Sequence, residues 1–231
     1  MSERVSTGVP GLDDMLNGGL IPGRVYLVKG APGTGKTTLA MHFAMAGVSR
    51  GENVLYVTLE EPADNIKQDF GKMGFDVYNS NFFLIDATPT TERYVLLEDI
   101  FETFAKNLEK LTDAILEKFG AIHFSRLVVD PITMLKMTSS TELDYRRAFL
   151  KFIKTMMRLK VTTLITSEME RTDVEEYLVS GVIELRTFEI KGVLERAVKI
   201  TKFRGSGFDR VIRPFEITDR GMVVHPDKTL F

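Results

Sequence analysis

The sequence of 231 residues contains no cysteine, so neither a disulfide nor a thiolate metal site can form. Its three histidines, His42, His123 and His225, are scattered and lack the spacing of metal ligands. No apolar run approaches the roughly 18 residues of a membrane-spanning helix. The start of the chain has no apolar segment typical of a signal peptide. These absences predict a soluble, cytoplasmic protein without membrane contact.

No sign of charge dominates the sequence either. Lysine and arginine together number 30 and aspartate and glutamate 32, which gives a formal net charge of −2. This balance gives no support for strong non-specific nucleic-acid binding, although a local basic loop is compatible with it. Hydrophobic residues make up 44%, enough to bury a core, and no linker or repeat divides the chain. We therefore expect one domain spanning residues 1–231.

A glycine-rich stretch matches the Walker A pattern G-x-x-x-x-G-K-[ST]. Residues 24–29 before it are typical of a strand, and residues 38–46 after it are typical of a helix. Glycine lets backbone N–H groups curl around a phosphate, and the helix N-terminus adds positive potential there. Lys36 is expected to reach the β- and γ-phosphates, and the Thr37 hydroxyl to ligate Mg²⁺. The expected nucleotide-binding residues are Gly30, Ala31, Pro32, Gly33, Thr34, Gly35, Lys36, Thr37 and Thr38.

The pattern of expected elements predicts an α/β fold with a mostly parallel central sheet flanked by helices. Strands and helices alternate in the first part of the chain, which is typical of βαβ units, with strands at 24–29, 54–59, 81–86, 125–130 and 161–167. After Arg171 the helices stop, and C-terminal antiparallel hairpins are expected from strands at 180–186, 195–203, 211–217 and 222–224.

One expected helix, over residues 94–119, is unusually long. Its apolar residues alternate at spacings of four and three, and they are Leu97, Phe101, Phe104, Leu108, Leu111 and Ile115. The pattern fits either a stripe that packs on the sheet or a coiled-coil arm. We favour the stripe, because coiled coils usually continue for more heptads.

Acidic residues end two of the expected parallel strands. Asp130 closes the apolar run 127–129 in the manner of a Walker B motif, so its carboxylate is expected to hold Mg²⁺ directly or through water. Glu60 and Glu61 follow the second strand, where one of them, Glu60 first, would orient the attacking water. Residues Thr166, Ser167 and Glu168 end the fifth strand and fit either a γ-phosphate sensor or an ordinary polar strand end.

Lys202 and Arg204 form a cationic pair near the C-terminus. Two positions apart on a strand, they are expected to point to one face. Such cations stabilise charge that develops on a transferring phosphoryl group, and a neighbouring subunit often donates them. Spacing alone favours a solvated pair on an edge strand.

Together these motifs resemble the KaiC-like branch of the RecA-type ATPases, and the resemblance covers essentially the whole chain. The motifs lie, in order, at residues 7–13, 18–24, 30–38, 60–62, 127–130, 181–185, 202–206 and 214–221. The Walker A motif is shared by many families, whereas the ordered set with the glutamate pair and the Lys-x-Arg-Gly segment is specific.

The resemblance implies a RecA-like P-loop fold, ATP and Mg²⁺ as cofactors, and a ring of subunits, usually a hexamer, with nucleotide between them. By resemblance, Glu60 and Glu61 are the catalytic carboxylates, and Lys202 and Arg204 reach the nucleotide of the next subunit. KaiC itself carries two such domains, whereas this chain has one. The phosphorylated Ser-Thr pair of the clock protein cannot be located in this sequence. Neither autokinase activity nor a clock function is therefore carried over.

Two other functions are compatible with the same motifs. A DNA-binding recombination or repair accessory ATPase, as in RadB-like proteins, would bind single strands through loops at residues 133–140 and 169–179. The first loop contains only Lys136 as a cation and the second is mostly acidic, so neither favours DNA. A non-hydrolysing nucleotide switch that controls an unknown protein partner is the third interpretation.

Overall fold

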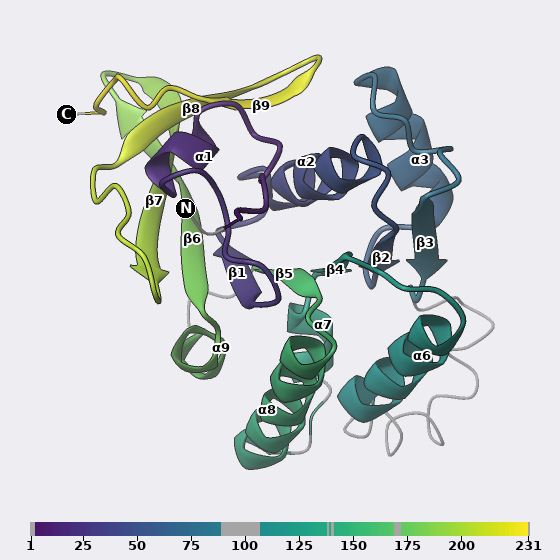
Figure 1. Ribbon diagram of the computed structural model, residues 1–231. Helices are drawn as coiled ribbons and strands as arrows, with labels where there is room; N and C mark the ends of the chain where they lie inside the picture. Colours follow the sequence, from purple (N-terminus) through teal and green to yellow (C-terminus); the bar gives the residue numbers. More distant parts are fainter. Residues whose placement is uncertain (1–2, 89–106, 138, 140, 169–171, 231) are drawn as a thin grey trace.

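The computed structural model describes residues 3–88, 107–137, 139, 141–168 and 172–230. Its strands are β1 (Val25–Lys29), β2 (Val54–Thr58), β3 (Phe82–Asp86), β4 (Arg126–Asp130), β5 (Thr162–Ser167), β6 (Gly181–Ile190), β7 (Val193–Phe203), β8 (Arg213–Thr218) and β9 (Gly221–Val224). They form one sheet in the order β3-β2-β4-β5-β1-β6-β7-β8-β9 (Figure 1). Pairing is parallel from β3 to β6 and antiparallel from β6 to β9. This arrangement confirms the predicted fold class.

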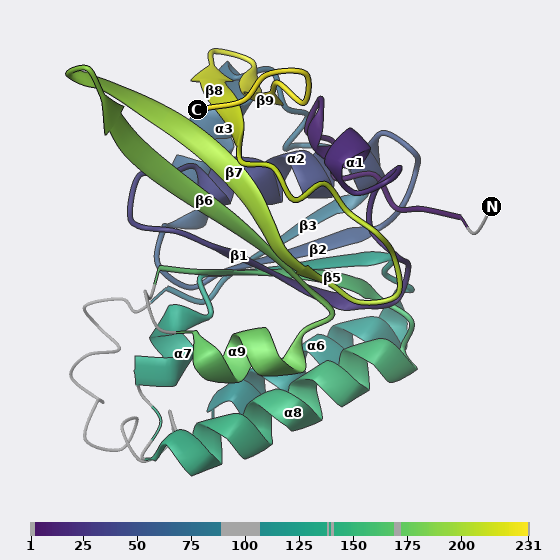
Figure 2. The ribbon, with the colours of Figure 1, turned by 90° about the vertical axis from the view of Figure 1, so that its left-hand side faces the viewer.

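Helices cover both faces of the parallel part of the sheet (Figures 1 and 2). One face carries α1 (Leu12–Met15), α2 (Lys36–Val48) and α3 (Ala63–Lys72), and the other carries α6 (Asn107–Ala121), α7 (Thr133–Met137), α8 (Glu142–Arg158) and α9 (Asp173–Leu178). Each face has its own hydrophobic core. Because both faces are covered, β2 and β4 are buried along their whole length, as their apolar sequences predict.

The second half of the helix predicted at residues 94–119 corresponds to α6. Residues 94–106 lie outside the described part of the chain. Within α6, Leu108 and Ile115 are buried in the core with Val57 of β2, and Leu111 packs against that core. In the described half, the apolar stripe therefore packs toward the sheet, as we favoured.

Two short helices stand where the sequence predicted loops. The expected loop at 133–140 contains α7, and the expected loop at 169–179 contains α9; residues 138, 140 and 169–171 lie outside the described part. The β6–β7 hairpin is longer than predicted, and its turn, which falls between the two predicted strands, is formed by Lys191 and Gly192, both with positive φ. In the part of the chain that the structure describes, no helix is long and apolar enough to cross a bilayer.

Candidate functional site

The Walker A residues form a loop between β1 and α2 at the carboxyl ends of the parallel strands. Gly30 N–H donates to the Ser167 carbonyl at 3.2 Å, which ties the loop to β5. A Cβ at Gly30 would lie 2.6 Å from the Leu185 carbonyl oxygen. Gly35 precedes α2 with φ 100°, and no side chain caps the helix. The N–H groups of the first turn of α2 therefore face the loop without a side-chain acceptor, as phosphate binding needs.

The Lys36 side chain lies across this loop and is only 5% exposed. Its Nζ donates to the Ala31 carbonyl at 3.0 Å and pairs with Glu168 Oε1 at 3.1 Å. Glu168 follows β5 directly, at the strand end where the sequence allowed a γ-phosphate sensor. A bound phosphate would compete with both oxygens for the same ammonium group.

Asp130, at the end of β4, is held by two hydroxyl groups from neighbouring strands. Tyr56 of β2 donates to its Oδ2 at 2.7 Å, and Thr166 of β5 donates to its Oδ1. The carboxylate is 5% exposed, so these bonds replace most of its hydration. Burial and the charge of Asp130 raise the pKa of Tyr56 well above its ordinary value, so Tyr56 remains a donor.

The glutamate pair and the two expected metal ligands, Thr37 and Asp130, line one cavity of about 380 Å³. The turn that brings the glutamate pair there is fixed by Thr58 Oγ1, which donates to the Glu61 carbonyl at 2.5 Å. The cavity is lined by Thr37, Thr58, Glu60, Glu61, Pro62, Asp130, Pro131 and Glu168. Four carboxylates face one space beside Lys36, so a cation there would reduce their repulsion of a polyphosphate.

Burial and the neighbouring carboxylates raise the pKa values of the two glutamates. Burial raises the pKa of Glu60, and the charges of Glu168 and Asp130 raise it further, while Lys36 opposes them. Burial raises the pKa of Glu61 as well. A carboxylate with a raised pKa is a better proton acceptor near neutral pH, which suits a group that orients and deprotonates water.

A second cavity, of about 560 Å³, lies on the other side of the P-loop. It is bounded by Gly30, Ala31, Pro32 and Thr34 and by the β6 residues from Glu184 to Phe188, and it shares Glu168 with the first cavity. The P-loop is thus flanked by space on both sides, with room for more than the phosphates of a nucleotide.

Lys202 and Arg204 are not part of either cavity. Gly181, the first residue of β6, pairs with both Tyr26 of β1 and Phe203 of β7. Phe203 is therefore level with Tyr26, and Lys202 with Leu27 in the middle of β1, whereas the P-loop follows the end of β1. From Tyr26 to Gly30 the chain advances by about 13 Å at the usual rise of a strand. The two cations thus lie away from the P-loop of their own chain.

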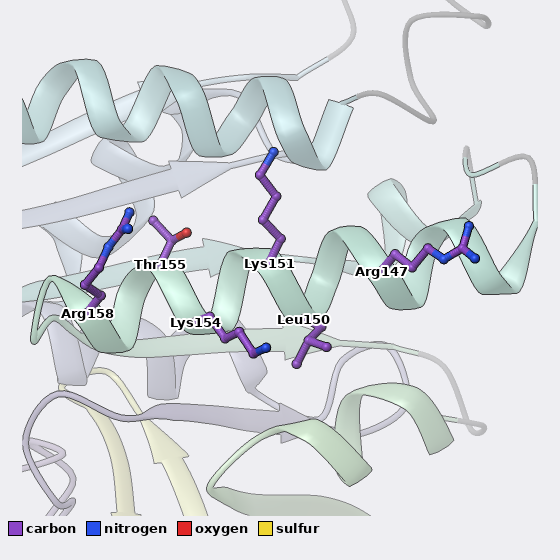
Figure 3. Close-up of a pocket in the computed structure, with 6 residues that line it drawn as sticks. All are labelled: Arg147, Leu150, Lys151, Lys154, Thr155 and Arg158. Atoms are coloured by element: carbon purple, nitrogen blue, oxygen red, sulfur yellow. The ribbon is translucent and has the colours of Figure 1, made fainter.

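A further cavity, of about 430 Å³, runs along the outer face of α8 (Figure 3). Figure 3 shows Lys151, Thr155 and Arg158 pointing to one side of the helix and Leu150 and Lys154 to the other. None of its lining residues belongs to the P-loop, the glutamate pair or the acid of β4. It is a basic surface groove, separate from the nucleotide site.

Sequence reasoning missed the residues that support the site. Tyr56 and Thr58 lie within an apolar strand, where nothing in the local pattern distinguishes a supporting hydroxyl from a core residue. Thr133 lies 3.2 Å from the Ser167 hydroxyl and accepts the Glu168 N–H at 3.0 Å. Its place beside β5 depends on α7, which the sequence did not reveal.

Comparison with known proteins agrees with this geometry. A model of the KaiC ATPase family matches residues 5–229. A UPF0273 protein of Pyrococcus horikoshii is 33% identical over 249 residues, which cover 100% of this chain and 97% of the relative. The circadian clock protein KaiC3 of Synechocystis sp. is 27% identical over 236 residues, which cover 97% of this chain and 46% of the clock protein.

A solved structure extends the agreement to three dimensions. The crystal structure of a KaiC-like protein from Pyrococcus horikoshii OT3 matches with a TM-score of 0.84 at 30% sequence identity. The match covers 98% of this chain and 100% of that chain. With the Walker A loop, the Walker B acid and the sheet order described above, these matches establish that the chain belongs to the KaiC family of RecA-type P-loop ATPases.

Proposed function

We propose that the protein hydrolyses ATP with Mg²⁺ at the interfaces between the subunits of a ring, and that the output is conformational. The observation that carries the proposal is the division of the expected catalytic groups. Thr37 of the P-loop, Asp130 and the glutamate pair line one cavity, whereas Lys202 and Arg204 lie outside it, on and just after β7, which is separated from β1 by β6. A site that uses both halves needs a second copy of the chain.

The oxygen donors at the cavity fit magnesium that arrives with the nucleotide. In the described part of the chain, no three histidine or acidic side chains are grouped to hold a metal on their own. The Thr37 hydroxyl and the Asp130 carboxylate are hard oxygen ligands beside the phosphate loop, the kind that Mg²⁺ shares with phosphates. The ion, when bound, would neutralise the charge on the β- and γ-phosphates.

The other roles follow from position and charge. Lys36 and backbone N–H groups at the N-terminal end of α2 bind the phosphates. Glu60 orients the attacking water and accepts its proton, with Glu61 as the second choice. Lys202 and Arg204 act on the nucleotide of the next subunit, where they stabilise charge that develops during transfer. A hexamer is the expected ring.

The first test separates binding from chemistry. Glu60→Gln should keep ATP binding and lose most phosphate release, because the amide cannot accept the proton of water. Glu61→Gln is the matched comparison, with the same chemical change one residue along. Full turnover in both variants would contradict the assignment of either glutamate as the base.

The second test concerns the shared site. Lys36→Ala and Arg204→Ala should each be inactive alone. After the two are mixed and reassembled, about a quarter of the interfaces should join an intact P-loop to an intact Arg204 and recover activity. Mass measurement of the assembly with and without Mg-ATP shows whether a ring forms. Absence of recovery in mixed rings would indicate a site complete within one chain.

A further inference from the structure

Helix α9 contacts both the strand that enters the P-loop and the cation pair on and just after β7. Lys29, the last residue of β1, pairs through Nζ with Glu176 Oε1 at 2.7 Å. Lys202 donates to the backbone carbonyl of Glu176 and, at 3.1 Å, to that of Tyr177. Arg204 donates to the same Tyr177 carbonyl at 3.0 Å. Glu176 thus touches the P-loop side through its carboxylate and the cation pair through its backbone.

The neighbouring residue fixes α9 to the helices behind it. Glu175 is fully buried, accepts a hydrogen bond from the Tyr145 hydroxyl at 2.9 Å, and pairs with Lys136 at 3.1 Å. Tyr145 belongs to α8 and Lys136 to α7, so α9 is held on the side away from the sheet. On the opposite side of α9, the Glu176 side chain and the last carbonyls of the helix contact Lys29, Lys202 and Arg204.

The pair between Lys29 and Glu176 lies directly beside the P-loop. Lys29 precedes Gly30 of the P-loop and lines the second cavity, and its Nζ also lies 3.7 Å from Glu184. Burial raises the pKa of Glu176, but hydrogen bonds from Lys29 and Thr172 outweigh it and lower the pKa overall. Glu176 is therefore charged at neutral pH, and a phosphate on the loop would compete with it for Lys29.

We propose that Glu176 is a positioning residue that couples the nucleotide in its own P-loop to the cation pair formed by Lys202 and Arg204. Phosphate at the loop draws Lys29 away from the Glu176 carboxylate. The last turn of α9 then shifts, and its carbonyls release the two cations. The inference rests on the proposed function, because the released cations would act on the next subunit's nucleotide.

Such a coupling predicts a specific kinetic behaviour. ATP bound in one subunit frees the cations that its neighbour needs, so each binding event raises turnover at the next site. The rate of hydrolysis should therefore rise sigmoidally with ATP concentration, with a Hill coefficient above about 1. If α9 has a purely structural role, a substitution at Glu176 should not change the shape of this curve.

The test uses Glu176→Gln in the full chain. Glutamine keeps the size of the side chain and leaves the backbone carbonyl in place, but removes the charge that competes for Lys29. The Hill coefficient should fall to about 1, while the affinity for a fluorescent ADP analogue should not fall, because the variant removes the carboxylate that competes with phosphate for Lys29. Asp173→Asn, which removes a charge from the first residue of the same helix, should leave the curve sigmoidal.

A second measurement does not depend on turnover. Arg204 N–H donates to the Ser180 carbonyl at 2.8 Å, so amide hydrogen exchange reports how tightly the cation segment is held. Binding of the β,γ-imido analogue of ATP should speed exchange at residues 176–180 and 202–204 in the original chain, and not in Glu176→Gln. If the chain does not hydrolyse ATP, the proposed function fails and this exchange alone decides the coupling. Equal exchange changes in both proteins, or an unchanged sigmoidal curve in Glu176→Gln, would overturn the inference.

Discussion

The hydroxyl of Tyr56 provides a direct measure of how the Walker B acid is held. Tyr56→Phe removes one oxygen and leaves the ring in its edge-on contact with Phe82, where the ring centroids are 6.0 Å apart. The lost bond joins a hydroxyl to a carboxylate at 2.7 Å. Hydrogen bonds to charged groups contribute about 1.5–3 kcal/mol. Because Asp130 is 5% exposed, water can replace little of this.

We therefore expect Tyr56→Phe to lower the free energy of unfolding by about 2 kcal/mol. For a chain of this length, that loss corresponds to a fall in Tm of about 4–8 °C. Urea titration and thermal unfolding of the nucleotide-free protein at neutral pH would measure it. The matched control is Tyr78→Phe, since Tyr78 is 77% exposed and should change stability by less than about 0.5 kcal/mol.

A double-mutant cycle with Thr166→Val then tests whether the two hydroxyls act on one carboxylate. Thr166 donates to the other oxygen of Asp130, so the two losses should be non-additive by at least about 0.5 kcal/mol. A destabilisation by Tyr56→Phe no larger than that of Tyr78→Phe would refute the reasoning. It would mean that the buried carboxylate finds other partners at no cost.

Three further predictions concern charge. Burial raises the pKa of Glu60 above its ordinary 4.5, so the native state holds the proton more tightly and loses stability as pH rises through the raised pKa. Glu60→Gln should thus raise the Tm of the nucleotide-free protein at neutral pH, and this advantage should vanish below about pH 4.5. Burial lowers the pKa of His42 below 6.5, so stability should fall as pH drops from 6.5 through the lowered pKa, and urea titrations of His42→Gln should lack this dependence. Glu52→Ala should lower the free energy of unfolding by about 3 kcal/mol in urea titration, because Arg126, 0% exposed, loses its only carboxylate partner in the described structure, 2.6 Å away.

The parts of the site that the sequence predicts are those with local chemical requirements. The P-loop needs glycine and lysine at fixed spacing, and Asp130 ends an apolar strand, so both can be recognised from consecutive residues. Tyr56 could not be recognised, because its partner lies 74 positions away and on another strand. Only the pairing of β2 with β4 brings the two together.

Helix α9 shows a different limit of sequence reasoning. The acidic stretch that contains it indicated an exposed loop, and its charge counted against DNA binding. One of those charges, Glu175, is fully buried and paired with Lys136, the single cation of the other expected loop. Neither Glu175 nor Lys136 is therefore a simple surface charge. A count of charges from the sequence treats every charged side chain as exposed, whereas tertiary packing decides which charged side chains are exposed and which are buried.

Strand β6 limits how the proposed two-subunit site can respond to nucleotide. Its first residues pair with Phe203 and Lys202, and its later residues line the cavity beside the P-loop. A strand hydrogen-bonded on both sides, to β1 and β7, changes length very little. The sheet therefore fixes the distance between the P-loop of a chain and the Lys202 and Arg204 that the same chain would place at its neighbour's nucleotide. Any nucleotide-driven change in the cations must then come from side chains or from α9, whose contacts with Lys29 and Lys202 involve no strand backbone.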